Sequence, residues 1–270
     1  MLTRHSVSRV RTVLVLAATI VMGAAAPAAA GLVGIGDDSY ILYDINTSNA
    51  VASNPRPVGN KINMIAYSPG GTLYGVSQGT PSDVPPGGML YTITVATGTP
   101  LYQATLDTFV FTEGDIAFDP TTGILYAVDG PGQLFKINTT TGAGTIVGNV
   151  GTGLDLSAMA FDAAGNLYMV ESFSQTLYEV NKTNAAVIST KPMGNVEQQI
   201  GGLAFAPSNG TLYFAGGYPS SKFYSVSTGT GTALLINPVS GAGAIWALTY
   251  IPDATPTRTS SWGRIKAIYR

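Results

Sequence analysis

Cysteine is absent from the 270-residue chain, and histidine occurs once, at position 5. The lack of cysteine excludes disulfide bonds, thiolate metal sites and cysteine nucleophiles. If His5 belongs to a removed leader, the mature chain also lacks Ser-His-Asp triads, histidine-ligated zinc and histidine acid–base catalysis. Charged residues make up only 10% of the chain, which argues against a disordered polyampholyte and against a nucleic-acid-binding protein.

The N-terminal 30 residues have the composition of a secretory signal peptide. A basic region with Arg4, Arg9 and Arg11 precedes the apolar run Val13–Met22, and Ala28–Ala30 provides the small residues that signal peptidase accepts. We therefore expect cleavage after Ala30 and a secreted, periplasmic or cell-surface protein with no membrane span after cleavage. The alternative is an uncleaved anchor, because residues 12–30 approach the ~20 residues that a spanning helix needs.

Charge is unevenly distributed along the remaining chain. Residues 31–253 contain six cations and fifteen acids, a net charge of −9, whereas residues 254–270 contain four cations and no acid. An acidic body repels phosphate and anionic lipid, so we expect no nucleic-acid partner. The sequence predicts a single domain over residues 31–253, followed by a Thr-Pro linker and a basic tail. The tail is either a disordered or loosely docked terminus, or a sorting or attachment signal of the kind on secreted bacterial proteins, which its Trp-Gly and basic-aromatic residues resemble.

A unit of four short apolar segments repeats along the predicted domain, and no long apolar pattern of helical period interrupts it. Its first segment combines a large apolar, a small and an aromatic residue, and the aromatic residues of successive copies are 51, 43, 44 and 45 residues apart. The five copies are Ile65–Tyr67, Ile116–Phe118, Met159–Phe161, Leu203–Phe205 and Leu248–Tyr250. A second segment opens Leu-Tyr in four copies, and a third precedes turns rich in Asn, Thr and Gly. Four strands per unit of this length are typical of a β-propeller blade.

The ends of the repeat indicate how the ring closes. Equivalents of the second, third and fourth strands precede the first complete unit, from residue 32 to 59, and a first-strand equivalent, residues 244–251, stands alone at the end. Together they complete one blade, which would remove the exposed edges of an open array. The sequence therefore predicts an all-β, five-bladed propeller of four-stranded antiparallel blades, closed by pairing of its N- and C-terminal strands.

The repeats also carry a family resemblance. Residues 117–128, Ala-Phe-Asp-Pro-Thr-Thr-Gly-Ile-Leu-Tyr-Ala-Val, followed by residues 134–138, Leu-Phe-Lys-Ile-Asn, resemble the repeats of secreted bacterial propellers of the NHL and YVTN kind. The resemblance covers residues 32–251. It implies the architecture and leaves the activity open, because this superfamily contains binding proteins, lactonases and glycosidases.

Acidic and amide residues gather at one end of the predicted blades. Loops that enter the first strand and loops that leave the second strand lie on the same face, here called the top face. The candidate ligand-binding residues there are Gln78, Glu113, Asp115, Asp129, Asp155, Glu171 and Glu197. They indicate an oxygen-rich funnel for a polyhydroxylated ligand or a hard cation, with Ca²⁺ as the candidate cofactor. The alternative is that they are solvated loop ends and turn formers, the role we expect for Asp119 and Asp162 on the opposite face.

Three classes of function are compatible with these features. The first is a secreted or surface-associated binding or scaffold module, whose partner would be a glycan, a peptide or a surface protein. The second is a metal-dependent lactonase or a carboxylate-pair glycoside hydrolase on the top face, whose chemistry needs only Asp and Glu. The third is a purely structural surface protein. The absence of histidine and cysteine and the regularity of the blades favour the first.

Overall fold

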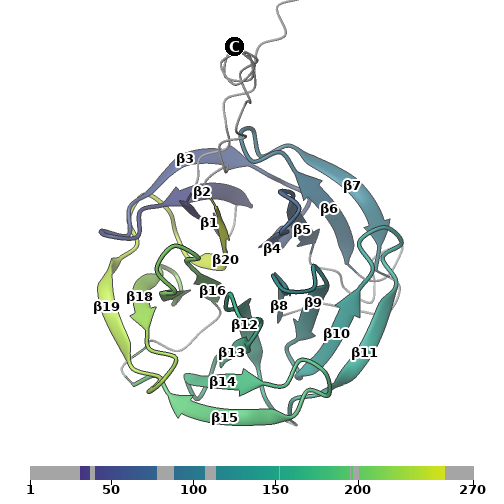
Figure 1. The fold of residues 1–270 in the computed structure, drawn as a ribbon. Coiled ribbons are helices and arrows are strands. Elements are labelled where there is room, and N and C mark those ends of the chain that lie inside the picture. Colours follow the sequence, from purple (N-terminus) through teal and green to yellow (C-terminus); the bar gives the residue numbers. More distant parts are fainter. Residues whose placement is uncertain are drawn as a thin grey trace, which may run out of the picture.

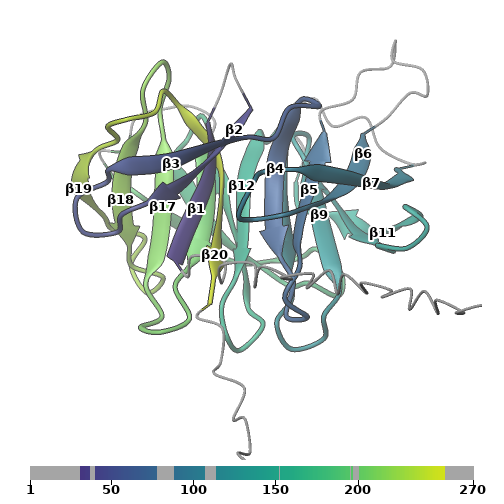
Figure 2. The same cartoon turned by 90° about the horizontal axis from the view of Figure 1, so that it is seen from above.

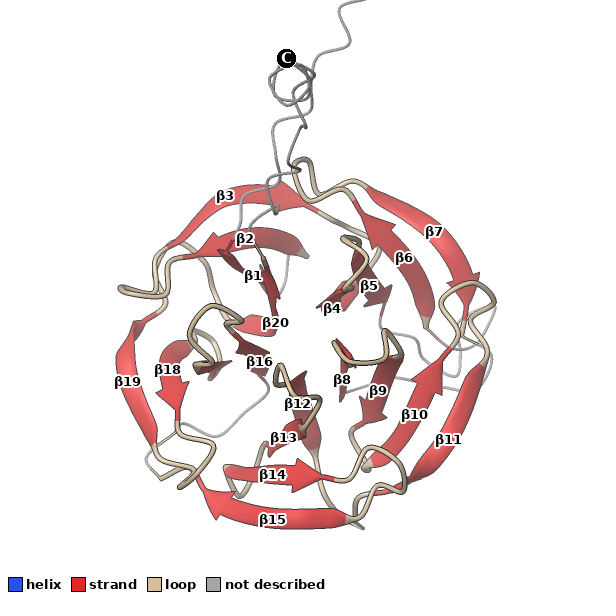
Figure 3. Cartoon of the chain, viewed as in Figure 1, coloured by secondary structure: helices blue, strands red, loops and turns tan. Residues whose placement is uncertain are grey.

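The computed structural model describes residues 31–36, 40–77, 88–106, 114–151, 153–194, 196 and 201–252. Within these residues the regular structure consists of strands, arranged as five four-stranded antiparallel sheets around a central channel (Figures 1 and 3). The side view shows the sheets standing next to one another around the ring (Figure 2). The chain is therefore a five-bladed β-propeller, as the repeat predicts. In the described part of the chain, no helix has the length and hydropathy needed to span a membrane.

Each blade extends from an innermost strand at the channel to an outermost strand at the rim (Figure 1). The innermost strands are β4 (Ile62–Tyr67), β8 (Gly114–Phe118), β12 (Leu156–Phe161), β16 (Gly201–Phe205) and β20 (Ile245–Ile251). The second strands are β5 (Leu73–Ser77), β9 (Leu125–Asp129), β13 (Leu167–Glu171), β17 (Leu212–Gly216) and β1 (Gly31–Gly36). The third strands are β6 (Met89–Ile93), β10 (Gln133–Ile137), β14 (Thr176–Val180), β18 (Lys222–Val226) and β2 (Ile41–Ile45). The outermost strands are β7 (Pro100–Thr105), β11 (Gly144–Asn149), β15 (Val187–Pro192), β19 (Ala233–Pro238) and β3 (Ala52–Pro57).

The ring closes through the strand pair that the split repeat predicts. β20 pairs antiparallel with β1, from Gly31 opposite Ile251 to Ile35 opposite Ala247, and β2 and β3 complete that sheet. The first and last described strands therefore share one blade. The innermost strand of this blade comes from the end of the chain, so all five innermost strands have a neighbour on each side.

Alternating side chains on the innermost strands fill the spaces between blades. On β12, Met159 and Phe161 belong to the cluster shared with the preceding blade, whereas Ala158 and Ala160 belong to the cluster shared with the following blade. The same division recurs around the ring, which contains five such clusters. The division follows from the repeat, because a strand sends successive side chains to opposite faces and the alanines let the next blade approach closely.

The outer part of each blade holds its neighbour through the turn between the third and fourth strands. Gly142 in the β10–β11 turn has φ 76°, and a Cβ there would lie 2.1 Å from the carbonyl oxygen of Thr105 at the end of β7. Glycine is required at this point because the turn lies directly on the preceding blade.

Each outermost strand pairs with the third strand of its blade through a register shift, and such bulges discourage edge-to-edge aggregation.

Candidate functional site

A pocket of about 450 Å³ lies at the mouth of the central channel, on the face where the innermost strands end. We call it the channel-mouth pocket. It lies opposite the top face, because the innermost strands begin at the top face and run away from it. Its volume is within the ~300–1,000 Å³ typical of small-molecule sites. Exposed turn residues such as Ala163 and Ala164 line its outer edge, so the pocket opens to solvent.

The wall of the pocket consists of successive rings of side chains from the five innermost strands. The outer ring is aromatic and consists of Tyr67, Phe118, Phe161, Phe205 and Tyr250. The next ring consists of Ala66, Ala117, Ala160, Ala204 and Thr249. Deeper in the channel lie Ile116, Met159, Leu203 and Leu248. The short side chains of the second ring leave the cavity open, and the five aromatic side chains of the outer ring surround its mouth. The pocket is therefore mainly apolar.

Three consecutive blades contribute phenylalanine to the outer ring, which we call the Phe arc (Phe118, Phe161 and Phe205). Each of these rings packs against a tyrosine of the second strand of the preceding blade. The centroid distances are 5.3 Å for Tyr74 and Phe118, 5.2 Å for Tyr126 and Phe161, and 5.4 Å for Tyr168 and Phe205. Tilted aromatic pairs at this distance are favourable, so the tyrosines stabilise the positions of the three phenylalanine rings. The tyrosines of the Leu-Tyr segments are thus packing residues between blades.

The other two blades contribute tyrosine, which we call the Tyr pair (Tyr67 and Tyr250). Tyr67 ends β4, and Tyr250 is the next-to-last residue of the neighbouring strand β20. The backbone N–H of Tyr67 donates to Oγ1 of Thr249 at 3.1 Å. The phenol oxygen of Tyr67 reaches the turn after β4, 3.8 Å from the position that a Cβ on Gly71 would occupy. The polar side-chain groups on this side of the pocket are therefore hydroxyls, those of Tyr67 and Tyr250 in the outer ring and that of Thr249 in the next ring.

A buried carboxyl group lies behind the deep end of the pocket. Asp115 is 1% exposed, and its two carboxyl oxygens accept hydrogen bonds from the backbone N–H groups of Ile116 at 2.8 Å and Met159 at 2.9 Å. Both donors belong to residues that line the pocket, and Met159 lies in the next blade. Burial raises the pKa of Asp115 well above its usual value, although these two hydrogen bonds act to lower it. Asp115 thus connects β8 to β12 and fixes their spacing at the channel.

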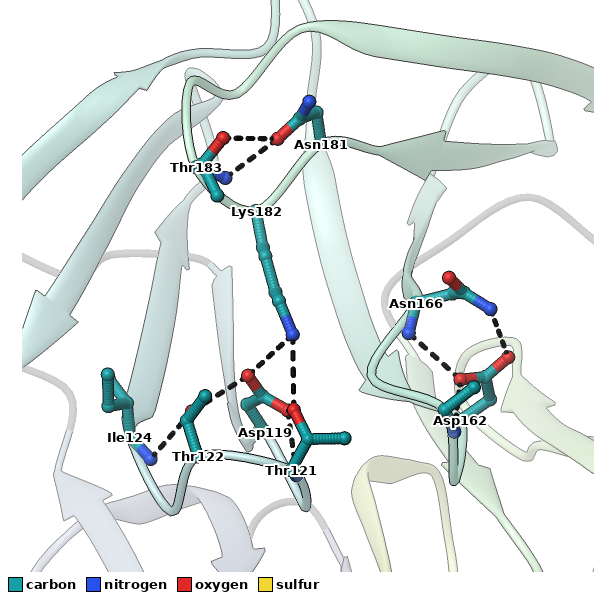
Figure 4. Close-up of polar contacts among 10 residues, drawn as sticks. Asp119, Thr121, Thr122, Ile124, Asp162, Asn166, Asn181, Lys182 and Thr183 are labelled. Atoms are coloured by element: carbon teal, nitrogen blue, oxygen red, sulfur yellow. Dashed lines mark hydrogen bonds and ion pairs between the residues drawn. The ribbon is translucent and has the colours of Figure 1, made fainter.

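An ion pair connects the same two blades beside the pocket (Figure 4). The side chain of Asp119 is fully buried and accepts hydrogen bonds from Thr121 and Thr122, and Nζ of Lys182 lies 2.7 Å from its Oδ2. Burial alone would raise the pKa of Asp119, but the contacts with Lys182 and the two threonines outweigh it and lower the pKa to about 2. Nζ of Lys182 also lies 5.7 Å from the centroid of the Phe161 ring. The turn-forming role predicted for Asp119 is confirmed, and the structure adds the inter-blade ion pair.

Asp162 is the one carboxylate among the described residues that line the pocket. Its Oδ1 accepts hydrogen bonds from the backbone N–H groups of Ala164 and Asn166, and its Oδ2 accepts one from the side-chain amide of Asn166 at 2.8 Å (Figure 4). Three hydrogen bonds therefore hold this carboxylate within its own turn. This confirms the turn-forming role predicted for Asp162.

The top-face residues predicted from the sequence are partly described. Gln78, Glu113 and Glu197 lie outside the described residues. Asp155 and Glu171 are adjacent, because the N–H of Asp155 donates to Oε1 of Glu171 at 3.3 Å.

Glu171 also accepts hydrogen bonds from the backbone N–H groups of Phe173 and Ser174, and these bonds with that from Asp155 outweigh burial and lower its pKa. Asp129 accepts a hydrogen bond from the backbone N–H of Gln133 at 2.6 Å, and burial raises its pKa. Among the residues that the structure describes, no three Asp, Glu, His or Cys side chains form a group that could hold a metal ion. The assignment of these residues to a ligand stays a prediction.

Solved structures with the same architecture include proteins without an assigned activity. A protein of unknown function from Bacteroides caccae has a TM-score of 0.54 at 12% identity, over 84% of this chain and 99% of that chain. A structural genomics protein of unknown function from Bacteroides thetaiotaomicron has a TM-score of 0.53 at 16% identity, over 85% of this chain and 66% of that chain. A chain of the nidogen/laminin complex has a TM-score of 0.50 at 11% identity, over 83% of this chain and 98% of that chain. These similarities support the fold alone. No protein-family model and no curated protein matches the sequence.

Sequence reasoning missed the channel-mouth pocket, although its residues were part of the repeat. The aromatic residue that ends each first segment packs between blades on one side and lines the pocket on the other. The sequence feature that indicates a pocket is the small residue before each of these aromatic residues. In all five blades it lies at the same level of the channel, where its short side chain leaves space.

Proposed function

We propose that the protein is a secreted or surface-associated binding module and that its ligand enters the channel-mouth pocket. The observation that carries this proposal is an apolar cavity of about 450 Å³ framed by five aromatic side chains and open to solvent. Concave apolar sites with a few polar groups at the edge are the usual form of small-molecule sites, and aromatic side chains supply large contact areas at low entropic cost. The predicted signal peptide supports a location outside the cytoplasm.

Binding is favoured over hydrolysis by the state of the described carboxyl groups. A glycoside hydrolase needs a carboxylic acid of raised pKa beside a second, ionised carboxylate. Glu171, which accepts a hydrogen bond from the backbone N–H of Asp155 on the top face, has a lowered pKa and is held by backbone N–H groups. Asp115 and Asp129 have raised pKa values, but Asp115 is fully buried with both oxygens occupied by backbone donors, and Asp129 is held by the backbone N–H of Gln133. We therefore place the functional site at the channel mouth.

The experiment is a fluorescence titration of the purified protein with N-phenyl-1-naphthylamine, an uncharged dye that brightens in apolar surroundings. We expect saturable binding that Ala163→Trp weakens by at least about tenfold, because a bulky side chain at this exposed lining position occupies the mouth. The matched control is Ala96→Trp, at an exposed alanine outside the pocket, which should leave binding unchanged.

The absence of saturable binding, or equal binding by the Ala163→Trp variant, would overturn the assignment of the site. The proposed location is tested by the intact mass of the protein recovered outside the cytoplasm. We expect the mass of a chain that begins at Gly31, and a chain that retains Met1 would contradict cleavage.

A further inference from the structure

The channel-mouth pocket has two chemically different sides, although the blades that form it are repeats. The Phe arc covers three consecutive innermost strands, and the Tyr pair covers the two that remain. Thr249, the residue before Tyr250, likewise carries a hydroxyl where the other four blades have alanine. The departures from the repeat in these two rings thus fall on one side of the ring, at β20 and β4.

The hydroxyl groups of the Tyr pair are available to a ligand. Within the described residues, neither phenol oxygen has a hydrogen-bond partner, whereas the rings themselves pack against the clusters between blades. A tyrosine that contacts solvent through its oxygen and the protein through its ring is suited to hydrogen-bond one end of an amphipathic molecule. The deep end of the pocket, formed by Ile116, Met159, Leu203 and Leu248, offers only apolar side chains.

The charges around the pocket indicate that the head of the ligand is uncharged. No Lys, Arg or His is among the described residues that line it, and the nearby Lys182 is paired with Asp119. An anionic head would therefore lose its hydration without gaining a cationic partner. The other polar side chains of the described lining, Asp162 and Thr228, lie on the side of the Phe arc and not beside the Tyr pair. Three hydrogen bonds hold Asp162 in its own turn, and Thr228 is hydrogen-bonded to Tyr168, so neither receives a cationic head at the Tyr pair.

We infer that the pocket takes an uncharged amphipathic molecule, whose apolar body lies against the Phe arc and whose hydroxyl group hydrogen-bonds the Tyr pair at the outer edge. This inference rests on the proposed function, since it names the class of ligand for the same site. The shape of the pocket supports the orientation, because the apolar end points toward the closed, apolar depth and the hydroxyl group stays near water.

The experiment compares three probes of one shape, 2-naphthol, 2-methylnaphthalene and 2-naphthoate, by displacement of N-phenyl-1-naphthylamine at neutral pH. The measured quantity is the ratio of the Kd of 2-methylnaphthalene to that of 2-naphthol, in the native protein and in Tyr67→Phe with Tyr250→Phe. Removing both hydroxyls should lower this ratio about 3- to 10-fold, the effect of one lost hydrogen bond. The control Tyr218→Phe makes the same change at a residue that is 57% exposed and outside the pocket, and it should leave the ratio unchanged. The anion 2-naphthoate should bind more weakly than 2-naphthol.

The outcomes separate this inference from the proposed function. If no probe displaces the dye, and the dye itself does not bind, the proposed function fails and this inference with it. If the probes bind but the ratio is the same in the double variant, the pocket remains a site and the hydroxyl-bearing ligand is refuted. Tighter binding of 2-naphthoate would refute the uncharged head. Should the double variant fail to melt cooperatively, Tyr67→Phe alone provides the same ratio, with the same outcomes.

Discussion

Replacing Lys182 by methionine removes the cation that holds two blades together while it keeps the apolar stem. Lys182 lies in the β14–β15 turn and pairs with Asp119 in the β8–β9 turn of the preceding blade. The carboxylate is fully buried and the lysine side chain is 24% exposed. Without the cation, Asp119 keeps only its threonine donors, so its ionised form becomes less favourable in the folded state.

The magnitude follows from the pKa of Asp119. A decrease from 3.8 to about 2 means that the folded state favours the ionised form, and one pKa unit corresponds to about 1.4 kcal/mol. This contribution, about 2 kcal/mol in all, is present above the unfolded pKa near 3.8 and is lost as the pH falls toward about 2. Since the threonines supply part of the shift and Lys182 is partly solvated, we expect Lys182→Met to lower the free energy of unfolding by about 1–2 kcal/mol at neutral pH. The difference from the native protein should shrink as the pH falls below about 3.8.

The assay is urea unfolding of the two proteins at neutral pH and at several values down to about pH 2. The matched control is Lys191→Met, because Lys191 pairs with Glu179 at 3.5 Å within one blade, and both side chains are partly exposed. Exposed pairs contribute about 0–1 kcal/mol, so the control should lose less and change less with pH. Equal losses for the two variants, or a Lys182→Met loss that does not depend on pH, would refute the role of the buried pair.

Three further predictions concern the innermost strands. Gly202→Ala should destabilise the protein by about 2 kcal/mol or more, because a Cβ there would lie 2.3 Å from a backbone nitrogen of β20. The control Gly70→Ala, at a position with space for a Cβ, should change the free energy of unfolding by less than about 0.5 kcal/mol in the same urea assay. Because burial raises the pKa of Asp115, the native protein should lose stability relative to the Asp115→Asn variant as the pH rises above about 3.8, and parallel pH profiles would contradict this. Deleting residues 244–270, which include β20, should produce an aggregating or unfolded protein, whereas deleting residues 253–270 should shift the Tm by only a few degrees in calorimetry.

The fold was predictable from the sequence because the same sequence pattern recurs in each blade. Short alternating strands, a small residue next to a large one and a turn drawn mainly from Asn, Ser, Thr and Gly recur at corresponding places in the units. The split blade was also predictable, because a ring that must close needs a partner for its first strand, and residues 244–251 had no other. Local patterns and global closure agree, which is the condition for a sequence to specify one structure.

The candidate site was less predictable, because it depends on distances across the channel. Sequence placed Asp115 among acids that would bind a ligand, but its side chain turns to the next innermost strand and accepts backbone hydrogen bonds from Ile116 and Met159. A spacing along the chain cannot distinguish these two orientations. The pocket depends in the same way on five side chains from five blades, and only the closed ring brings them to one level.

A repeat protein also provides its own control for function, because each position occurs once in every blade. Packing between blades is satisfied by alanine and phenylalanine at the ends of β8, β12 and β16, so it does not by itself require the phenol hydroxyls of Tyr250 and Tyr67. The hydroxyl of Thr249 connects the two blades by accepting a hydrogen bond from the backbone N–H of Tyr67. The phenol hydroxyls of Tyr67 and Tyr250 have no hydrogen-bond partner within the described residues, and they give the mouth of the channel a polar side. Packing between blades does not require the Phe arc and the Tyr pair to differ in polarity. A site that orients an amphipathic molecule does require this difference. The direction of this asymmetry, with the hydroxyls outermost and the apolar ring deepest, is what the naphthol comparison measures.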